Sequence, residues 1–183
     1  TIEEARQIAG AARGAGNGRA PMAVGIFVDA GVVALNDATG EVGLDLVQLH
    51  GAESPEMLAA IDAPVIKVVR VKPGSGFDQT AARIDVFERS PKPPVAYLID
   101  GYHPRHAGGQ GVLADWELAR RLAERFPIVL AGGLTPENVG EAIAAVRPLG
   151  VDVSSGVETE GAKDRQKVLD FVANARRAVG GDS

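Results

Sequence analysis

The stretch IVLAGGLTPEN at residues 128–138 and the stretch GVDVSSGVE at residues 150–158 decide the fold class. Each is a short apolar run that ends at small residues and is followed by residues that favour the start of a helix. In a parallel α/β protein this pattern places glycine backbone and open helix N–H groups at the carboxyl ends of neighbouring strands. Such a place suits a phosphate, because backbone N–H groups and the helix dipole both attract an anion.

Composition narrows the class of protein. The 183 residues suit one domain, residues 1–183, and 45% of them are apolar while 23% are charged. The net charge of −5 and a pI near 5.2 argue against a nucleic-acid partner, and no apolar run approaches a membrane-spanning length. The absence of cysteine excludes disulfides and thiolate chemistry within these residues. We expect a soluble cytoplasmic protein.

Strands and helices alternate along the chain. A capping box at Thr1 and Glu4 predicts an opening helix, and the β-branched run at residues 22–29 predicts a strand buried on both faces. Ser54 is expected to cap the helix that follows the second strand, and Trp116 to pack at the start of its helix. Strands are predicted at 22–29, 44–50, 65–71, 96–100, 128–131 and 151–154, and helices at 5–13, 31–39, 55–61, 79–89, 115–125, 136–146 and 164–179.

This strict alternation predicts a parallel sheet, either an open doubly wound sheet or a (β/α) barrel. No strand is followed by G-x-G-x-x-G opening a helix, and the glycines at residues 14–18 follow a helix, which favours a connector. Polar or small residues end several strands, which is typical of a barrel. These strand-end residues are Asp29, His50, Asp100, Gly132, Ser154 and Ser155. Six strands are too few to close an eight-stranded barrel, so two strands and one helix are expected upstream.

Phosphate binding is the favoured function of Gly132-Gly133 and Ser155-Gly156. Glycine lets a ligand approach the backbone, and Thr135 with the helix after it is expected to supply capping and N–H donors. The alternative is that these glycines only form tight turns. Phosphate is preferred because two adjacent units carry the feature, where barrels often bind phosphate.

Asp100 is the candidate acid or base. It directly follows the apolar residues 97–99, and a partly desolvated carboxyl at a strand end suits proton transfer. A capping role for its own loop is an equal alternative. A metal site of Asp100, His103 and His106 is disfavoured, because a glycine-rich loop is a poor cage for a metal. For His50, hydrogen bonding at the strand end and substrate contact stay open, and no Gly-x-Ser-x-Gly elbow supports a nucleophile.

Four segments, in order and at suitable spacing, resemble one known family. They are VQLHG at 47–51, Asp100 with GGQG at 108–111 and DW at 115–116, AGGL at 131–134, and DVSSGVE at 152–158. Together they closely resemble the phosphoribosylanthranilate isomerase family of tryptophan biosynthesis. The resemblance implies a (β/α)₈ barrel and an Amadori rearrangement of N-(5-phosphoribosyl)anthranilate to 1-(2-carboxyphenylamino)-1-deoxyribulose 5-phosphate, with no cofactor or metal and as a monomer or homodimer.

The resemblance also assigns residues. Asp100 matches the family's general acid, which opens the ribose ring by protonating its ring oxygen. The phosphate-binding loops match Gly132 and Gly133 together with Ser155 and Gly156. Gly109, His50 and Asp152 are the further candidates for substrate or phosphate binding.

Two of the family's segments are not matched in this sequence. The family's general base is a cysteine in a Lys-x-Cys-Gly context, and an arginine in a Ser-Pro-Arg segment holds the anthranilate carboxylate. The first five residues match the start of the family's second helix, so strands three to eight and helices two to eight are expected here. We expect the chain alone to be inactive and to expose unpaired strand edges.

Two alternative functions stay open. Another phosphosugar barrel, such as an indole-glycerol-phosphate synthase or a histidine-pathway isomerase, is one alternative. A non-catalytic phosphate-binding fragment, or one half of a complementing pair, is another.

Overall fold

A computed structural model describes residues 1–14, 20–71, 74–101 and 110–180, with the backbone alone at residues 101 and 110–115. The chain forms two compact units, which are described in turn. The first comprises Thr1–Val68 and Arg83–Ala96, and the second Val69–Ala82 and Tyr97–Ser183.

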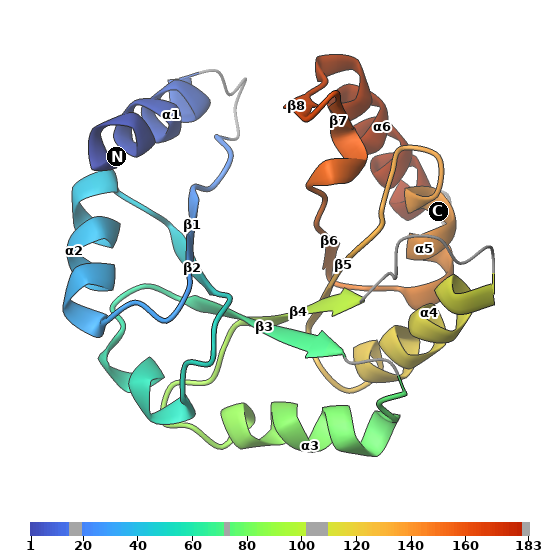
Figure 1. The fold of residues 1–183 in the computed structure, drawn as a ribbon, viewed down its shortest axis with the longest axis horizontal. Coiled ribbons are helices and arrows are strands. Elements are labelled where there is room, and N and C mark those ends of the chain that lie inside the picture. Colours follow the sequence, from blue (N-terminus) through green and yellow to red (C-terminus); the bar gives the residue numbers. More distant parts are fainter. Residues whose placement is uncertain (15–19, 72–73, 102–109, 181–183) are drawn as a thin grey trace. The chain divides into compact units, whose positions relative to one another are not determined.

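Helices and strands alternate as the sequence predicts (Figure 1). The helices are α1 (Ile2–Gly14), α2 (Val32–Val42), η1 (Pro55–Ala60), α3 (Phe77–Glu88), α4 (Gln110–Ala123), α5 (Val139–Val146), η2 (Ser155–Val157) and α6 (Arg165–Gly180). The strands are β1 (Val24–Phe27), β2 (Leu46–Leu49), β3 (Val65–Val71), β4 (Ala96–Gly101), β5 (Ile128–Ala131), β6 (Gly150–Val151), β7 (Glu158–Thr159) and β8 (Ala162–Lys163). Strands β1 to β6 follow chain order in one sheet. The pairs β1–β2, β2–β3, β4–β5 and β5–β6 are parallel, so the protein is α/β.

In the first unit, β2 pairs with β1 on one side and with β3 on the other. The predicted capping box is present, because the Thr1 Oγ1 accepts the Glu4 N–H at 3.2 Å and the Glu4 carboxylate accepts from Thr1. Helix α1 starts at Ile2, earlier than the predicted residue 5. Helix α2 ends at Val42 and is capped by Gly43, whose φ of 74° permits the left-handed turn. One core joins α2 and η1 to the strands, and its buried members are Leu35, Val47, Leu49, Leu58, Ile61, Ala63 and Val65.

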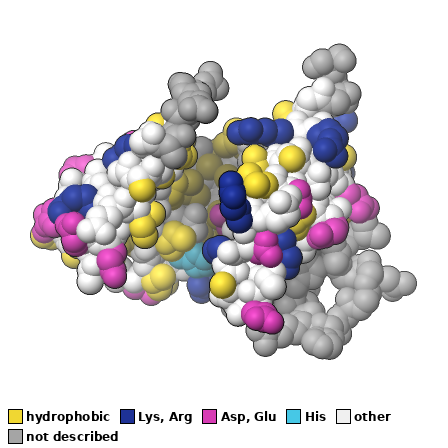
Figure 2. Space-filling view, turned by 90° about the horizontal axis from the view of Figure 1, so that it is seen from above, with side chains coloured by type: hydrophobic (Ala, Val, Ile, Leu, Met, Phe, Trp, Pro, Cys, Tyr) yellow, Lys and Arg dark blue, Asp and Glu magenta, His cyan; other side chains and the backbone are white. Residues whose placement is uncertain are grey.

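Two predictions for this unit are wrong. Strand β1 is not buried on both faces, since Val24 is 41% and Ile26 65% exposed. The reason is that β1 ends the sheet, with β2 as its one neighbour among the described strands. Hydrophobic side chains accordingly reach the surface in the part of the chain that holds β1 (Figure 2). The segment after Ser54 is a 3₁₀ helix, and Ser54 makes no side-chain cap bond to it.

In the second unit, β4 pairs with β5 and β5 with β6. Helices α4, α5 and α6 pack side by side along β5 and β6 (Figure 1). Trp116 packs among them, but it does not lie at the start of its helix as predicted, because α4 begins at Gln110 and not at residue 115. Strand β6 is only two residues long, and the β7–β8 hairpin that follows was not predicted. Among the described residues, no helix has the length and apolarity that crossing a membrane requires.

Candidate functional site

The carboxyl ends of β4, β5 and β6 bring three predicted residues to one edge. The register pairs Asp100 of β4 with Ala131 of β5, the residue just before Gly132. The N–H of Asp152 donates to the Leu130 oxygen at 2.8 Å, which fixes the end of β6 at the same edge. Asp100 is half-buried there, as a carboxyl at a strand mouth should be. The second unit therefore assembles Asp100, Gly132 and Asp152 at a single place.

The turn after β5 needs glycine. Gly132 and Gly133 have φ values of 89° and 67°, in the left-handed region that a residue with a side chain rarely adopts. Asn138 holds the turn, because its Nδ2 donates to the Gly133 oxygen at 3.0 Å and its Oδ1 accepts the Thr135 N–H at 2.8 Å. The backbone of this turn is therefore fixed rather than loosely connected.

The helix after this turn begins later than predicted. Helix α5 starts at Val139, not at residue 136, with Asn138 at its N-cap. Asn138 makes no side-chain bond to the helix because its amide is engaged in the preceding turn. The Thr135 Oγ1 accepts the Glu137 N–H at 3.3 Å, so Thr135 supports the turn instead of capping α5. The prediction that Thr135 caps the helix is thus wrong in detail.

The two glycine segments touch each other. A Cβ built on Gly156 would lie 1.8 Å from the backbone oxygen of Leu134, far inside any allowed contact. Only glycine lets the segment after β6 approach the segment after β5 this closely. Ser155 begins η2 and is exposed beside this contact. The two segments are therefore packed backbone against backbone.

Lys163 anchors the same loop, and sequence reasoning missed it. Its Nζ donates to the Ser154 oxygen at 2.9 Å and to Glu158 Oε1 at 2.6 Å. The hairpin β7–β8 places this lysine, and its turn contains Glu160 and Gly161 with φ values of 52° and 81°. Gly161 between two short polar segments was the available sign of a hairpin.

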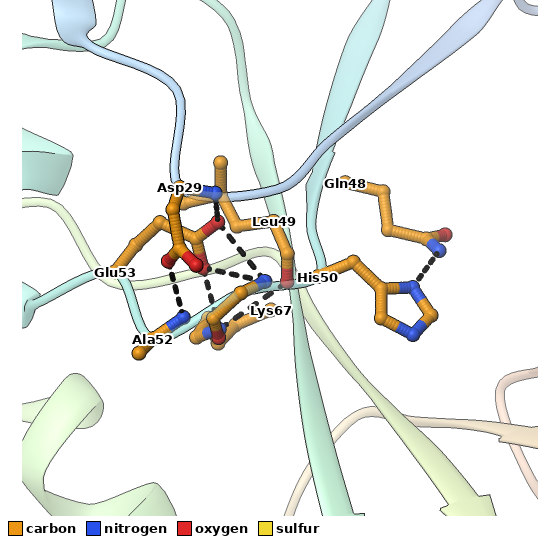
Figure 3. A network of polar contacts seen from close by, with 8 residues as sticks. Asp29, Gln48, Leu49, His50, Ala52, Glu53 and Lys67 are labelled. Atoms are coloured by element: carbon orange, nitrogen blue, oxygen red, sulfur yellow. Dashed lines mark hydrogen bonds and ion pairs between the residues drawn. The ribbon is translucent and has the colours of Figure 1, made fainter.

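In the first unit, His50 follows β2 directly. Its N–H donates to the Phe27 oxygen at 2.8 Å, and its Nδ1 lies 3.4 Å from Nε2 of Gln48. Figure 3 shows the His50 ring and Gln48 on one side of the backbone and a cluster of charged groups on the other.

That cluster is a buried ion pair of Glu53 and Lys67. The two charged atoms are 2.9 Å apart, and the side chains are 1% and 5% exposed. Lys67 Nζ also donates to the oxygens of Gly51 at 2.8 Å and Leu49 at 3.3 Å. Glu53 Oε1 accepts the N–H groups of Asp29 and Gly51, both at 3.0 Å. Nearly every hydrogen-bonding capacity of the pair is therefore satisfied.

Asp29 joins the end of β1 to the same loop. It has a φ of 50°, and its Oδ1 accepts the Ala52 N–H at 2.6 Å. A Cβ on Gly51 would lie 2.7 Å from the Asp29 nitrogen, so glycine is required where the two segments meet. Sequence reasoning singled out Asp29 and His50 but not Glu53 or Lys67.

The pKa of Glu53 lies below its ordinary value of 4.5. Burial raises this pKa, but hydrogen bonds from Lys67 and from the N–H of Asp29 outweigh burial. The unfolded chain thus binds a proton near pH 4.5, and the folded chain only at lower pH. Ionised Glu53 consequently stabilises the fold above that pH, and the contribution is lost as the pH falls through the lower, folded value.

Glu53→Gln should lower the free energy of unfolding by ~3 kcal/mol at pH 7, because Lys67 would remain buried without its counter-charge. The difference from the parent should be smaller at pH 3, because the stability that ionised Glu53 contributes is lost progressively as the pH falls below 4.5. Urea unfolding at the two pH values measures it. Glu4→Gln, at a carboxylate 72% exposed, is the control and should change little. An equal loss at both pH values would show that ionisation of Glu53 does not stabilise the fold.

Some predicted residues lie outside the described part of the chain. Gly109, His103 and His106 are among them, so the loop after β4 enters no structural argument. Within the described residues, no three histidine, aspartate or glutamate side chains gather as metal ligands would.

The chain is similar in sequence to proteins of known function. The family model described as N-(5'phosphoribosyl)anthranilate (PRA) isomerase matches residues 6–174. The N-(5'-phosphoribosyl)anthranilate isomerase of Roseiflexus castenholzii is 46% identical over 98% of this chain and 82% of its own length. This chain belongs to the N-(5'-phosphoribosyl)anthranilate isomerase family.

Solved structures agree with the family. The phosphoribosyl anthranilate isomerase of Thermotoga maritima superposes with a TM-score of 0.77 at 36% identity, over 96% of this chain and 80% of that one. A second isomerase, in complex with reduced 1-(o-carboxyphenylamino)-1-deoxyribulose 5-phosphate, gives 0.75 at 34% identity over 96% and 79%. The predicted family and its isomerase class are therefore confirmed.

Proposed function

We propose that the protein converts N-(5-phosphoribosyl)anthranilate to 1-(2-carboxyphenylamino)-1-deoxyribulose 5-phosphate, in tryptophan biosynthesis. The observation that carries this proposal is the meeting of Asp100 with two glycine segments, at 132–133 and 155–156, at one sheet edge. A phosphorylated sugar needs an anion cradle at one end and a proton donor near its ring. The second unit offers a candidate for each.

Asp100 is the proposed general acid. As Asp100 protonates the ribose ring oxygen, the C1–O bond breaks and the anilino nitrogen lone pair forms a C1=N bond. Loss of the C2 proton to a base then gives the enolamine. Protonation of C1 and loss of the C2 hydroxyl proton give the ketose. The phosphate, held by backbone N–H groups at Gly132, Gly133, Ser155 and Gly156, anchors the sugar while these protons move. Gly109, Asp152 and His50 are proposed as further contacts of substrate or phosphate.

This sequence has no residue that matches the general base of the family. None of the 183 residues is cysteine. We propose that the chain contributes strands three to eight and helices two to eight of one (β/α)₈ domain, and that a cysteine and an arginine encoded before Thr1 complete the site. Two observations support this: the Roseiflexus relative is longer than the matched region, and Val24 and Ile26 of β1 are exposed. Reading the gene upstream of Thr1 tests it, and an upstream segment without that cysteine would overturn it.

The 183-residue chain alone should not rescue a tryptophan auxotroph that lacks the isomerase. Loss of the base should lower activity at least ~10²-fold. The complete gene product is the positive control and should restore growth. Rescue by the chain alone would show that the base lies within these residues.

A different phosphosugar reaction is not favoured, because the matching family model and the relatives carry the name of this isomerase. If the protein only bound phosphate, the complete gene product would bind phosphate but would not convert the substrate. The cytoplasm is the proposed compartment and a monomer or homodimer the proposed state.

A further inference from the structure

The backbone on both sides of His50 is held by groups that the proposed chemistry does not use. Lys67 donates to the oxygen of Leu49, the residue before His50, and to that of Gly51, the residue after it. Glu53 accepts the Gly51 N–H, and Phe27 accepts the N–H of His50 itself. Four backbone N–H and C=O groups around one histidine are thus fixed at the end of β2.

The ion pair acts on His50 from the opposite face of the sheet. The register pairs Lys67 of β3 with Leu49 of β2, so their side chains share a face, and Leu49 lies in the core beneath α2. Successive residues of a strand alternate, so the His50 ring points to the other face. Figure 3 shows this separation. Lys67 therefore reaches the ring through the backbone on either side of it.

The pair is also built to resist movement. Both side chains are almost fully buried, and the Lys67 ammonium lies 5.8 Å from the centre of the Phe87 ring. Glu53 additionally holds the N–H of Asp29 at the end of β1. A buried, fully bonded pair that spans three segments is costly to form, and its bonds converge on the turn that carries His50.

We propose that Glu53 and Lys67 are positioning residues, which hold the turn at the end of β2 so that His50 presents its imidazole to the substrate. The kinetic part of this inference rests on the proposed isomerase function. The structural part does not, since it concerns only where the ring lies.

The test uses the double variant Lys67→Met/Glu53→Gln of the complete gene product. It leaves no unpaired buried charge, and glutamine can still accept the N–H groups of Asp29 and Gly51, so the fold should survive. Lys92→Met is the matched control, because Lys92 Nζ also donates to two backbone oxygens, those of Ile61 and Asp62, before β3. It should leave kcat/KM within about twofold of the parent.

We expect the double variant and His50→Ala each to lower kcat/KM at least ~10-fold, since a small misplacement of a contacting group is costly. Combining them should lower it no further than His50→Ala alone, because the pair acts through the histidine. If the combined variant lost kcat/KM by the product of the two separate losses, the proposal would be overturned. An unchanged kcat/KM in the double variant or in His50→Ala would also overturn it.

Nuclear magnetic resonance separates this inference from the proposed function. The sequence has three histidines, and His50→Ala identifies the ring signals of His50. These signals should move in the double variant and stay in place in Lys92→Met, even if the protein proves not to be an isomerase. An unmoved His50 signal in the double variant would contradict the positioning role, whatever the activity.

Discussion

Asp100→Asn should lower kcat ~10²- to 10⁴-fold while phosphate affinity stays nearly unchanged. Asparagine keeps the size and polarity of the side chain but cannot donate the proton that opens the ribose ring. The residue sits beside Ala131 at the sheet edge, so the glycine segments should keep their shape. Steady-state kinetics with N-(5-phosphoribosyl)anthranilate, and calorimetric binding of inorganic phosphate, measure the two effects.

Asp170→Asn is the matched control for this substitution. Asp170 lies exposed on α6, where it accepts a hydrogen bond from Gln166 at 2.9 Å, away from the strand ends. Its replacement should leave kcat as it is. Survival of normal turnover in Asp100→Asn would show that another group is the acid.

Gly156→Ala should raise the Kd for inorganic phosphate by ~10²-fold, because the new methyl group cannot coexist with the Leu134 oxygen. The Cβ would lie 1.8 Å from that oxygen and 2.9 Å from its carbon, and both atoms are backbone, so neither can rotate away. The segment after β6 must therefore move off the segment after β5. Some loss of stability, ~1–3 kcal/mol, should accompany this overpacking.

Gly140→Ala is the control for added volume. Gly140 lies within α5, and a Cβ there would meet nothing within 4 Å. Alanine should leave phosphate binding unchanged and stabilise the helix by about 0.5–1 kcal/mol. If phosphate binding were equally tight in Gly156→Ala, the contact between the two glycine segments would have no part in holding the anion.

Strands with a mainly apolar sequence could be predicted. The bounds of β3 and β5 are as predicted, because each run is mostly buried and is bounded by turn residues. Strand β1 has the same kind of sequence but has one neighbour among the described strands, and the sequence alone cannot reveal how many neighbours a strand has. Helix α5 starts late because Asn138 bonds backward into the turn, a choice that depends on the Gly133 oxygen.

Only part of the candidate site could be predicted from the sequence. Glycine after an apolar run indicated the two turns, yet their contact depends on Leu134 and Gly156 meeting across 22 positions of the chain. Lys67 lies within an apolar strand, where a lysine normally points to solvent. Its partner Glu53 lies 14 residues away in a loop, and only the folded chain pairs them.

We propose that this protein isomerises a phosphoribosylated anthranilate. The most direct measurement is to incubate the purified complete gene product with N-(5-phosphoribosyl)anthranilate and to separate substrate from product by chromatography. We expect 1-(2-carboxyphenylamino)-1-deoxyribulose 5-phosphate to form in the parent and to be strongly reduced in Asp100→Asn. An intact, folded gene product that leaves the substrate unchanged would contradict the proposed function.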